Sequence, residues 1–301
     1  MENQTCTQEF KMMPFSMTSG FTSLYFTMFF LIYLFGVFTN TVIIMLIYSS
    51  YHLHIPMYLF ICNLAIVDIC YTTVTVPKFL YMLLSKNNKV SYRECFTQMY
   101  FYLLDASTED ILILTMAFDR YVAICHPLHY HRILNKRNCI LLVAGVWTAG
   151  SFNSSVITIA ASNMAFCQSK VIHQFFCDGK ALINIACAGL NHFYTVIYLD
   201  AFLFGLCPFF FSLLSYVKII KVILQMQSKE GRRKAFATCS SHLAVIFMYY
   251  TTAVSVYLMP KYSVILEQIC SVLYTTITPM INPLIYSLRN NDVKKALKKI
   301  L

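Results

Sequence analysis

Six carboxylic acids stand inside long apolar stretches of this chain, where side chains have little water around them. They are Asp68, Asp105, Glu109, Asp110, Asp119 and Asp200. An uncompensated charge is costly in such surroundings, so each group is expected to be protonated, paired or bound to a cation. The chemistry open to these residues is therefore proton sharing, cation binding or recognition of a polar ligand.

Three of the acids fall at a similar depth. Asp68 lies about eleven residues from the start of its apolar stretch, and Glu109 lies about eleven residues before Arg120. At ~1.5 Å per residue, both carboxyls reach the middle of a bilayer. Asp105 precedes Glu109 by one helical turn and shares its face. Neighbouring carboxyls cannot all be ionised without a counter-ion. Three interpretations stay open: a sodium ion at Asp68 and Glu109, shared protons, or a neutral hydrogen-bonded core without a regulatory role.

The composition supplies helices that can position these acids. The chain has 301 residues, of which 58% are hydrophobic and only 12% are charged, too few charges to cover a soluble domain. A membrane-spanning helix needs about 20 apolar residues. Seven stretches reach that length. They are Ser23–Tyr48, Met57–Leu84, Phe96–Ala123, Cys139–Ala161, Phe193–Leu224, Phe236–Met259 and Ile269–Leu288. The sequence thus predicts an all-α membrane protein whose single domain is a seven-transmembrane helix bundle.

Basic residues gather on one side of the predicted bundle. They concentrate at Arg132–Arg137, Lys218–Lys234 and Arg289–Lys299, and the chain carries a net charge of +10. Because basic loops are retained in the cytoplasm, this side is expected to be cytoplasmic and the N-terminus extracellular. The same placement favours contact with anionic lipid of the inner leaflet over nucleic acid binding.

The two ends of the chain flank the bundle, which we place at residues 23–288. Residues 1–22 are expected to form an extracellular N-terminus, and residues 289–301 a cytoplasmic tail. Four apolar residues of the tail share one face of a helix, which predicts a short amphipathic C-terminal helix. They are Val293, Ala296, Leu297 and Ile300.

Two triplets match the sequon for N-glycosylation. Asn3-Gln4-Thr5 lies on the expected extracellular tail, where it could carry sugar. Asn153-Ser154-Ser155 lies inside the expected fourth helix and is not expected to be used. No cleavable signal peptide is expected, because the first apolar stretch is too long to be the core of one.

One string at the end of the expected third helix is more specific than these patterns. Met116-Ala-Phe-Asp-Arg-Tyr-Val-Ala-Ile-Cys-His-Pro-Leu-His-Tyr130 places an Asp119-Arg120 pair where the helix leaves the membrane. The Asp-Arg-Tyr triplet resembles the switch of rhodopsin-like G-protein-coupled receptors, and the longer string resembles their olfactory receptor branch. Further matching strings are Pro56–Phe60, Ser215-Tyr216, Lys234–Leu243 and Pro279–Asn290. Departures from the usual pattern are Thr39-Asn40, Asp110 and Tyr249-Tyr250-Thr251.

The resemblance implies an odorant receptor, which binds a small odorant and activates a stimulatory heterotrimeric G protein to raise cyclic AMP. Such a protein is not an enzyme, and it would lie in the plasma membrane of olfactory neuron cilia. The residues implied in the switch are Asp119, Arg120, Tyr121, Tyr216, His242, Asn282, Pro283 and Tyr286. Those implied in ligand binding are Tyr102, Leu103, Ala106, Ser107, Asp200, Ala253, Tyr257, Val272 and Thr275. No cofactor is expected besides the sodium ion considered above.

Four cysteines fall in regions expected outside the cell, where oxidation is permitted. They are Cys95, Cys167, Cys177 and Cys187. Sequence alone allows three ways of pairing them. The resemblance implies pairing of Cys95 with Cys177 and of Cys167 with Cys187, which leaves Cys6 as a free thiol.

Other classes of protein fit less well. In amine receptors of the same superfamily, an acid stands eighteen residues before the switch arginine, and here that position is Tyr102. A transporter or channel would suit the buried acids, but paired half-repeats with broken helices are missing. An enzyme is disfavoured because the sequence shows no nucleophile–base set, no metal-ligand spacing and no phosphate loop.

Overall fold

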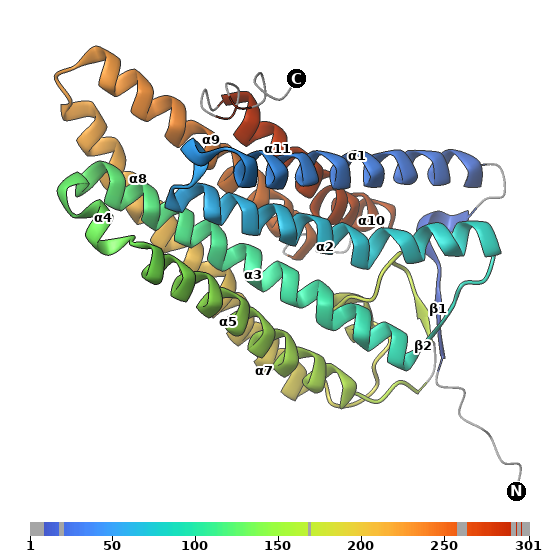
Figure 1. The fold of residues 1–301 in the computed structure, drawn as a ribbon. Helices are drawn as coiled ribbons and strands as arrows, with labels where there is room; N and C mark the ends of the chain where they lie inside the picture. The colour runs from blue at the N-terminus through green and yellow to red at the C-terminus, as the bar shows by residue number, and fades with distance from the viewer. Residues whose placement is uncertain are drawn as a thin grey trace, which may run out of the picture.

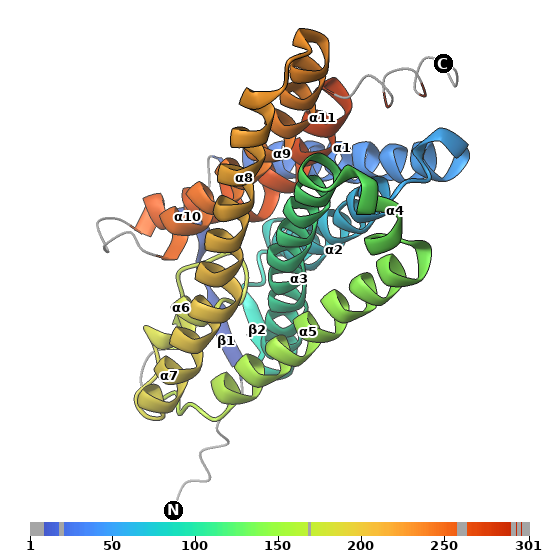
Figure 2. The same ribbon diagram turned by 90° about the vertical axis from the view of Figure 1, so that its left-hand side faces the viewer.

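The computed structural model describes residues 9–17, 21–167, 170–257 and 264–289, together with Val293 and Ala296. Seven helical rods make up most of this part of the chain. They are α1 (Thr22–Ser49), α2 (Pro56–Ser85), α3 (Tyr92–Cys125), α5 (Lys136–Ser162), α7 (Leu190–Asp200) continued by α8 (Cys207–Gln225), α9 (Lys229–Tyr257), and α10 (Val264–Val272) continued by α11 (Thr278–Arg289). The rods lie side by side, and α3 runs through their middle in contact with α2, α5 and α8 (Figures 1 and 2).

The fifth and seventh rods each contain one π-helical segment. Ala201–Leu206 joins α7 to α8, and Leu273–Ile277 joins α10 to α11. A proline follows each segment closely, at Pro208 and Pro279. Because proline lacks a backbone N–H and crowds the preceding turn, the hydrogen-bond ladder is disturbed at that point. The wider π turn accommodates the disturbance without ending the rod.

Several helix ends carry the residues that stabilise them. Ser91 accepts a hydrogen bond from the Glu94 N–H at 3.2 Å, and Glu94 accepts one from the Ser91 N–H at 3.0 Å, so α3 begins with a capping box. Asn135 caps α5 by accepting from the Asn138 N–H at 2.9 Å. Pro56 occupies the first turn of α2, where its missing N–H costs nothing.

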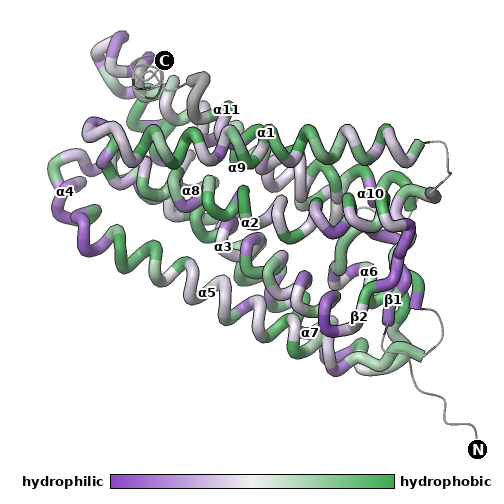
Figure 3. The backbone as a smooth tube through the Cα atoms, turned by 45° about the vertical axis from the view of Figure 1, so that its right-hand side comes forward, coloured by the Kyte–Doolittle hydropathy of each residue, from purple (hydrophilic) through white to green (hydrophobic). Residues whose placement is uncertain are grey.

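Most rods have the length and hydropathy of membrane helices. Among the described residues, five are long and apolar enough to cross a bilayer, and α3 makes a sixth when counted with the bent helices at Pro127–Ile133. The rod α9 is not among them, and it begins with the basic run Gly231-Arg-Arg-Lys234. Hydrophobic residues prevail along α1 in Figure 3, whereas hydrophilic residues gather at both ends of the bundle. Large apolar side chains such as Phe38 and Phe211 point outward, as expected for a lipid-facing surface.

Close packing holds α5 against α3. A side chain at Gly150 would collide with the Thr108 hydroxyl, so only glycine allows the two backbones to approach this closely. Nearby, the Ser154 hydroxyl donates to the Tyr100 carbonyl, and the Tyr100 and Ser151 hydroxyls lie 2.8 Å apart. These contacts fix the face of α5 that carries Asn153.

A small sheet lies at one end of the bundle. Its central strand β1 (Glu9–Met12) pairs antiparallel with β2 (Lys89–Ser91) and parallel with β3 (Val171–Ile172). We call this end the β1 end. The opposite end carries α4 (Tyr130–Ile133), and we call it the α4 end (Figure 1). The sheet was not expected, because each strand is too short to show an alternating pattern and the partners are far apart in sequence.

The predicted helix ranges agree with the structure to within four residues, except that α9 begins seven residues and α10 five residues earlier than expected. The seven-transmembrane all-α bundle is therefore confirmed, with the small sheet as an addition. Residues 9–17 contribute the central strand of that sheet and the short helix Pro14–Met17. Asn3, Cys6 and Pro260 lie outside the described residues, as do Leu297 and Ile300 of the expected amphipathic tail.

Candidate functional site

The mid-membrane acids lie together in the structure. Asn282 of α11 donates from Nδ2 to both oxygens of Asp68, at 3.1 and 3.3 Å, and lies within hydrogen-bonding reach of Glu109. Asp68, Asp105 and Glu109 are all at least 98% buried. Glu109 Oε1 and Asp105 Oδ2 have no hydrogen-bond partner among the described residues. The cluster therefore has oxygen atoms free to hold a proton or a cation, although no group of three metal-ligating side chains with suitable geometry occurs within the described ranges.

A second polar group joins three helices nearer the β1 end. Asn153 of α5 donates from Nδ2 to the Ser107 hydroxyl of α3 at 2.9 Å and to Asp200 Oδ1 of α7 at 2.7 Å. Asp110 faces Asp200 and lies within hydrogen-bonding reach of the Tyr249 hydroxyl. Asp200 is partly exposed, while Ser107 and Asn153 are buried. Asn153 thus fixes the position of one carboxylate oxygen of Asp200.

Aromatic rings surround the same level of α3. The Tyr102 ring lies 5.2 Å from that of Tyr71 and 4.8 Å from that of Phe176, measured between centroids. The Tyr249 hydroxyl lies 3.1 Å from the Tyr274 hydroxyl and donates to the Ala106 carbonyl at 3.4 Å. These rings provide contact area, and their hydroxyls can orient a ligand.

The other residues expected in the ligand pocket differ in their surroundings. Leu103, Ala106, Ala253 and Val272 are half-buried and pack against the core. Thr275 is fully buried and donates its hydroxyl hydrogen to the Ser271 carbonyl of its own helix at 2.9 Å. The side chain of Tyr257 lies outside the described residues. The structure thus joins Ser107 to Asp200 through Asn153, whereas Tyr102 packs against Tyr71 and Phe176.

The Asp-Arg pair lies at the α4 end. Arg120 Nε is 3.9 Å from Asp119 Oδ2, and Asp119 Oδ1 accepts a hydrogen bond from the Tyr130 hydroxyl at 2.9 Å. Burial and the Asp119 carboxylate both raise the pKa of Tyr130, so its hydroxyl stays protonated and able to donate. The Asp119 carboxylate is therefore shared between Arg120 and Tyr130, and this sharing weakens its interaction with the Arg120 guanidinium.

A second contact at this end involves His242 of α9. The Tyr216 hydroxyl lies 2.8 Å from His242 Nδ1, and both residues are buried. The contact joins α8 to α9, whose first turns carry the basic run Gly231-Arg-Arg-Lys234. Nearby, Tyr121 packs under the Lys218 ammonium at 5.6 Å and reaches His126 at 3.1 Å. Pro283 lies inside α11 next to Asn282, and the side chain of Tyr286 is not among those described.

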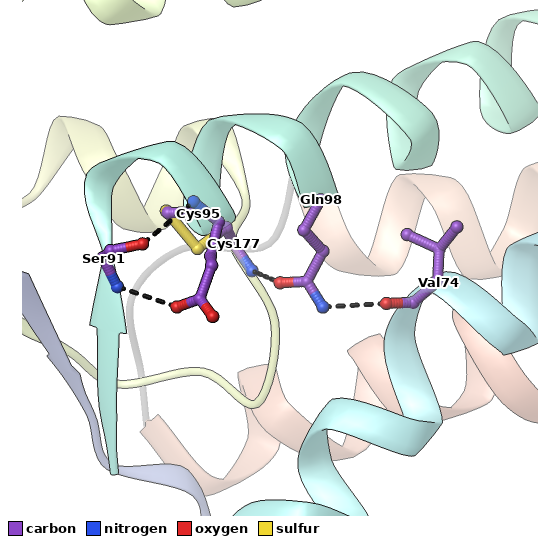
Figure 4. Close-up of a disulfide and its surroundings, with 6 residues drawn as sticks. Val74, Ser91, Cys95, Gln98 and Cys177 are labelled. Atoms are coloured by element: carbon purple, nitrogen blue, oxygen red, sulfur yellow. Dashed lines mark hydrogen bonds between the residues drawn. A yellow bond between two sulfur atoms is a disulfide. The ribbon is translucent and has the colours of Figure 1, made fainter.

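Two disulfides stabilise the loop before α7: one ties it to α3, and the other lies within the loop. Cys95 of α3 is bonded to Cys177, and Cys167 is bonded to Cys187. This is the pairing that the family resemblance implies. Figure 4 shows how Gln98 supports the first bridge: its Oε1 accepts from the Cys177 N–H at 2.9 Å, and its Nε2 donates to the Val74 carbonyl at 2.8 Å.

Ionisable groups near this bridge have shifted pKa values. Hydrogen bonding from the Ser91 backbone is the main reason that the pKa of Glu94 lies below its ordinary value. Burial raises the pKa of Asp178 to about 6, although Lys180 and the start of α6 (Gly179–Ile183) favour its carboxylate. Lys180 in turn pairs with Glu267 of α10 at 3.2 Å, which links this loop to the seventh rod.

Sequence reasoning missed several of these partners. Asn153 was considered only as an unused sequon, yet it is the residue that joins Asp200 to Ser107. A buried amide in an otherwise apolar helix was the available signal, because such a group needs hydrogen-bond partners. The Tyr130–Asp119 contact gave no signal, since it depends on the turn between α3 and α4.

Taken together, the fold and these sites define a seven-helix membrane receptor of the rhodopsin-like, G-protein-coupled class. A polar and aromatic region lies toward the β1 end, and an Asp-Arg pair lies at the α4 end. No arrangement of this kind is required for catalysis.

Comparison with known proteins identifies the family. The olfactory receptor family model matches residues 29–301. The chain is 39% identical to olfactory receptor 1E16 of Mus musculus over 300 residues, covering 99% of this chain and 96% of that protein. It is 43% identical to olfactory receptor 2T5 of Homo sapiens over 303 residues, covering 100% and 96%. The chain therefore belongs to the olfactory receptor family, whose members are membrane receptors and not enzymes.

Proposed function

We propose that this receptor binds a small odorant toward the β1 end and activates a stimulatory heterotrimeric G protein at the α4 end, which raises cyclic AMP. The observation that supports this most is that two polar sites lie at opposite ends of α3. Ser107 and Tyr102 face one site, whereas Asp119 and Arg120 face the other. A ligand that favours one packing of the helices can therefore change the other end through a population shift.

The orientation in the membrane is part of the proposal. The basic residues of α4, α8 and α9 put the α4 end in the cytoplasm by the positive-inside rule. The two disulfides lie at the β1 end, which suits an oxidising extracellular space. The receptor would then lie in the plasma membrane of olfactory cilia with Asn3 outside the cell and available for glycosylation. Protease protection of an N-terminal tag in sealed vesicles tests this orientation.

A panel of odorants tests the function directly. The full-length receptor is expressed with a cyclic AMP reporter, and the Tyr102→Ala variant serves as the control for the site. At least one odorant is expected to raise cyclic AMP through the parent receptor and to lose potency on Tyr102→Ala. The proposal is contradicted if the receptor reaches the cell surface and none of the odorants in the panel raises cyclic AMP. It is also contradicted if the Tyr102→Ala variant responds to the odorants as strongly as the parent receptor.

Asp200 is proposed as the polar handle for the ligand. Asn153 bonds Oδ1, so a cationic or donor-rich ligand can bond the other oxygen. A hydrogen bond to a carboxylate contributes ~1.5–3 kcal/mol. Asp200→Asn is therefore expected to weaken the response to the best cationic ligand about tenfold or more, because an amide keeps the Asn153 contact and removes the charge. Dose–response curves for cationic and neutral ligands measure this. Equal shifts for both kinds of ligand would make Asp200 a structural residue.

A sodium ion or shared protons are proposed to neutralise Asp68 and Glu109. The unpartnered Glu109 Oε1, buried beside the Asp68 carboxylate that Asn282 bonds, supports a bound proton or ion at this level. If sodium binds, the basal activity of the parent receptor depends on sodium, and Asp68→Asn and Glu109→Gln each remove that dependence and shift the basal level. Basal cyclic AMP in sodium and in choline media measures it. A parent receptor insensitive to sodium would exclude the ion site and leave shared protons or a neutral hydrogen-bonded core.

A further inference from the structure

Residues 9–17 are built into the β1 end of the bundle. The Lys11 N–H donates to the Lys170 carbonyl at 2.7 Å, and the Met13 N–H donates to the Ile172 carbonyl at 2.8 Å. On the other side of β1, the Met12 N–H donates to the Asn88 carbonyl at 2.9 Å. Phe10 and Met12 are buried, with 1% and 0% of their surface exposed. The segment is thus as well packed as a core strand, although it joins the bundle only through loops and helix ends.

A single buried glutamine of the seventh rod joins this segment to the loop beside it. Gln268 Oε1 accepts from the Phe15 N–H at 2.7 Å. Its Nε2 donates to the His173 carbonyl at 2.9 Å and to the Met13 carbonyl at 3.4 Å. The side chain is 1% exposed, so its amide has exchanged water for these three backbone partners. A glutamine side chain suits this position because it accepts at one end and donates twice at the other.

The residue that Gln268 holds has an unfavourable backbone conformation. Phe15 has φ 49°, in the left-handed region that residues with a side chain seldom adopt. That conformation aims its ring at Tyr25, Phe79 and Phe175, with centroid distances of 5.3, 6.1 and 6.3 Å. Without the hydrogen bond from the Phe15 N–H to Gln268, residues 9–17 would be expected to adopt a more favourable backbone conformation and to move away from these rings.

The rings continue from Phe15 toward the proposed ligand site. The ring centroid of Phe175 lies 4.9 Å from that of Phe176, and the ring centroid of Phe176 lies 4.8 Å from that of Tyr102. Both phenylalanines belong to the loop that supplies His173 and Cys177. A displacement of this loop or of residues 9–17 would therefore change what covers Tyr102.

We propose that Gln268 is a positioning residue that latches residues 9–17 to the loop at His173, so that the two segments form one lid over the ligand site. This inference rests on the proposed function in placing that site at Tyr102. With the latch made, Phe175 stays packed against Phe176, Phe176 stays packed against Tyr102, and the site is closed to water. With the latch broken, the lid opens more often and solutes enter the site faster.

Cysteine accessibility tests the lid without an agonist. Ala106→Cys places a thiol at the ligand site, and a water-soluble, positively charged methanethiosulfonate reagent reports how often it is reached in the full-length receptor. Adding Gln268→Met, which keeps the volume and removes every polar contact, is expected to speed labelling about tenfold. Adding Gln174→Met is the matched control: Gln174 donates to the Ser271 hydroxyl at 3.2 Å from the same loop to the same helix, and its Oε1 accepts no hydrogen bond among the described residues. It is expected to leave the rate unchanged.

Hydrogen exchange in the same variants supplies an independent measurement. The amides of Lys11 and Met13 are expected to exchange faster in Gln268→Met and to be unchanged in Gln174→Met. Equal labelling and exchange in the parent and Gln268→Met would overturn the latch, and so would equal acceleration by Gln174→Met. Because neither measurement uses an odorant, failure of the lid is distinguishable from failure of the proposed odorant response.

A second variant covers the case in which Gln268→Met does not reach the cell surface. Gln268→Glu keeps the size of the side chain and its acceptor for the Phe15 N–H. In its neutral form it can also donate to the His173 carbonyl, whereas in its ionised form it cannot. Labelling of Ala106→Cys is therefore expected to speed up with rising pH in Gln268→Glu by more than in the parent. A pH profile parallel to that of the parent would contradict the latch.

Discussion

Arg120→Ala is expected to abolish cyclic AMP output while leaving ligand binding intact. Arg120 lies at the α4 end, where it is 15% exposed and 3.9 Å from Asp119, and it belongs to the opposite end of α3 from Tyr102. Its carboxylate partner is already shared with Tyr130, so little free energy is needed to release the guanidinium toward a G protein. Removing the side chain takes away that contact without disturbing the ligand site.

The measurement is a dose–response curve in cells with matched surface expression, together with ligand binding to membranes. Arg93→Ala is the control, because Arg93 is an exposed arginine of the same helix at the β1 end. It is expected to signal normally. Full cyclic AMP output from Arg120→Ala at the cell surface would show that the switch lies elsewhere.

Cys95→Ser and Cys177→Ser are each expected to cause misfolding and retention in the endoplasmic reticulum. The bridge closes a loop with a sequence separation of 82 residues and fixes Phe176 over Tyr102. Loss of a native disulfide typically costs ~2–5 kcal/mol, which is a large part of the stability of a folded domain. Surface labelling is expected to fall to the background level.

The second bridge supplies a graded comparison. Cys167 and Cys187 are separated by only 20 residues, so loop-closure entropy predicts that losing this bridge costs about 1 kcal/mol less. Cys167→Ser is therefore expected to retain more surface receptor than Cys95→Ser. Cys70→Ser, which alters a free half-buried thiol of α2, serves as the control with normal expression. Peptide mapping that finds Cys95 as a free thiol in active receptor would refute the pairing.

The helices could be predicted from sequence because their signal is local and repeated. Apolar runs of membrane length placed α1 and α2 within a residue of their observed ends. The π turns themselves could not be predicted, because proline at 208 or 279 is equally compatible with a simple kink. The sheet was missed because strands of two to four residues carry no periodic pattern.

The sequence predicts how deep the candidate site residues lie in the membrane, but it does not predict which residues they contact. Counting residues placed Asp68 and Glu109 at one level, and the structure brings both to Asn282. The amide of Asn153 had to bond something, but its sequence position could not say that the partner would be Asp200 on another helix. Gln268 gave no signal at all, because its three partners are backbone atoms that only the folded loops bring near.

The π turn between α7 and α8 gives the fifth rod two independent rotational phases. Each residue of an α-helix turns the chain by about 100°, and a π turn holds one residue more than an α turn. The direction in which Asp200 points is therefore set by that extra residue, while Tyr216 beyond Pro208 keeps the phase of α8. Gain or loss of a single residue in Ala201–Leu206 would turn α7, which carries Asp200, and leave α8 unrotated where Tyr216 meets His242. The orientation of Asp200 can thus vary along one helix while the Tyr216–His242 contact is kept.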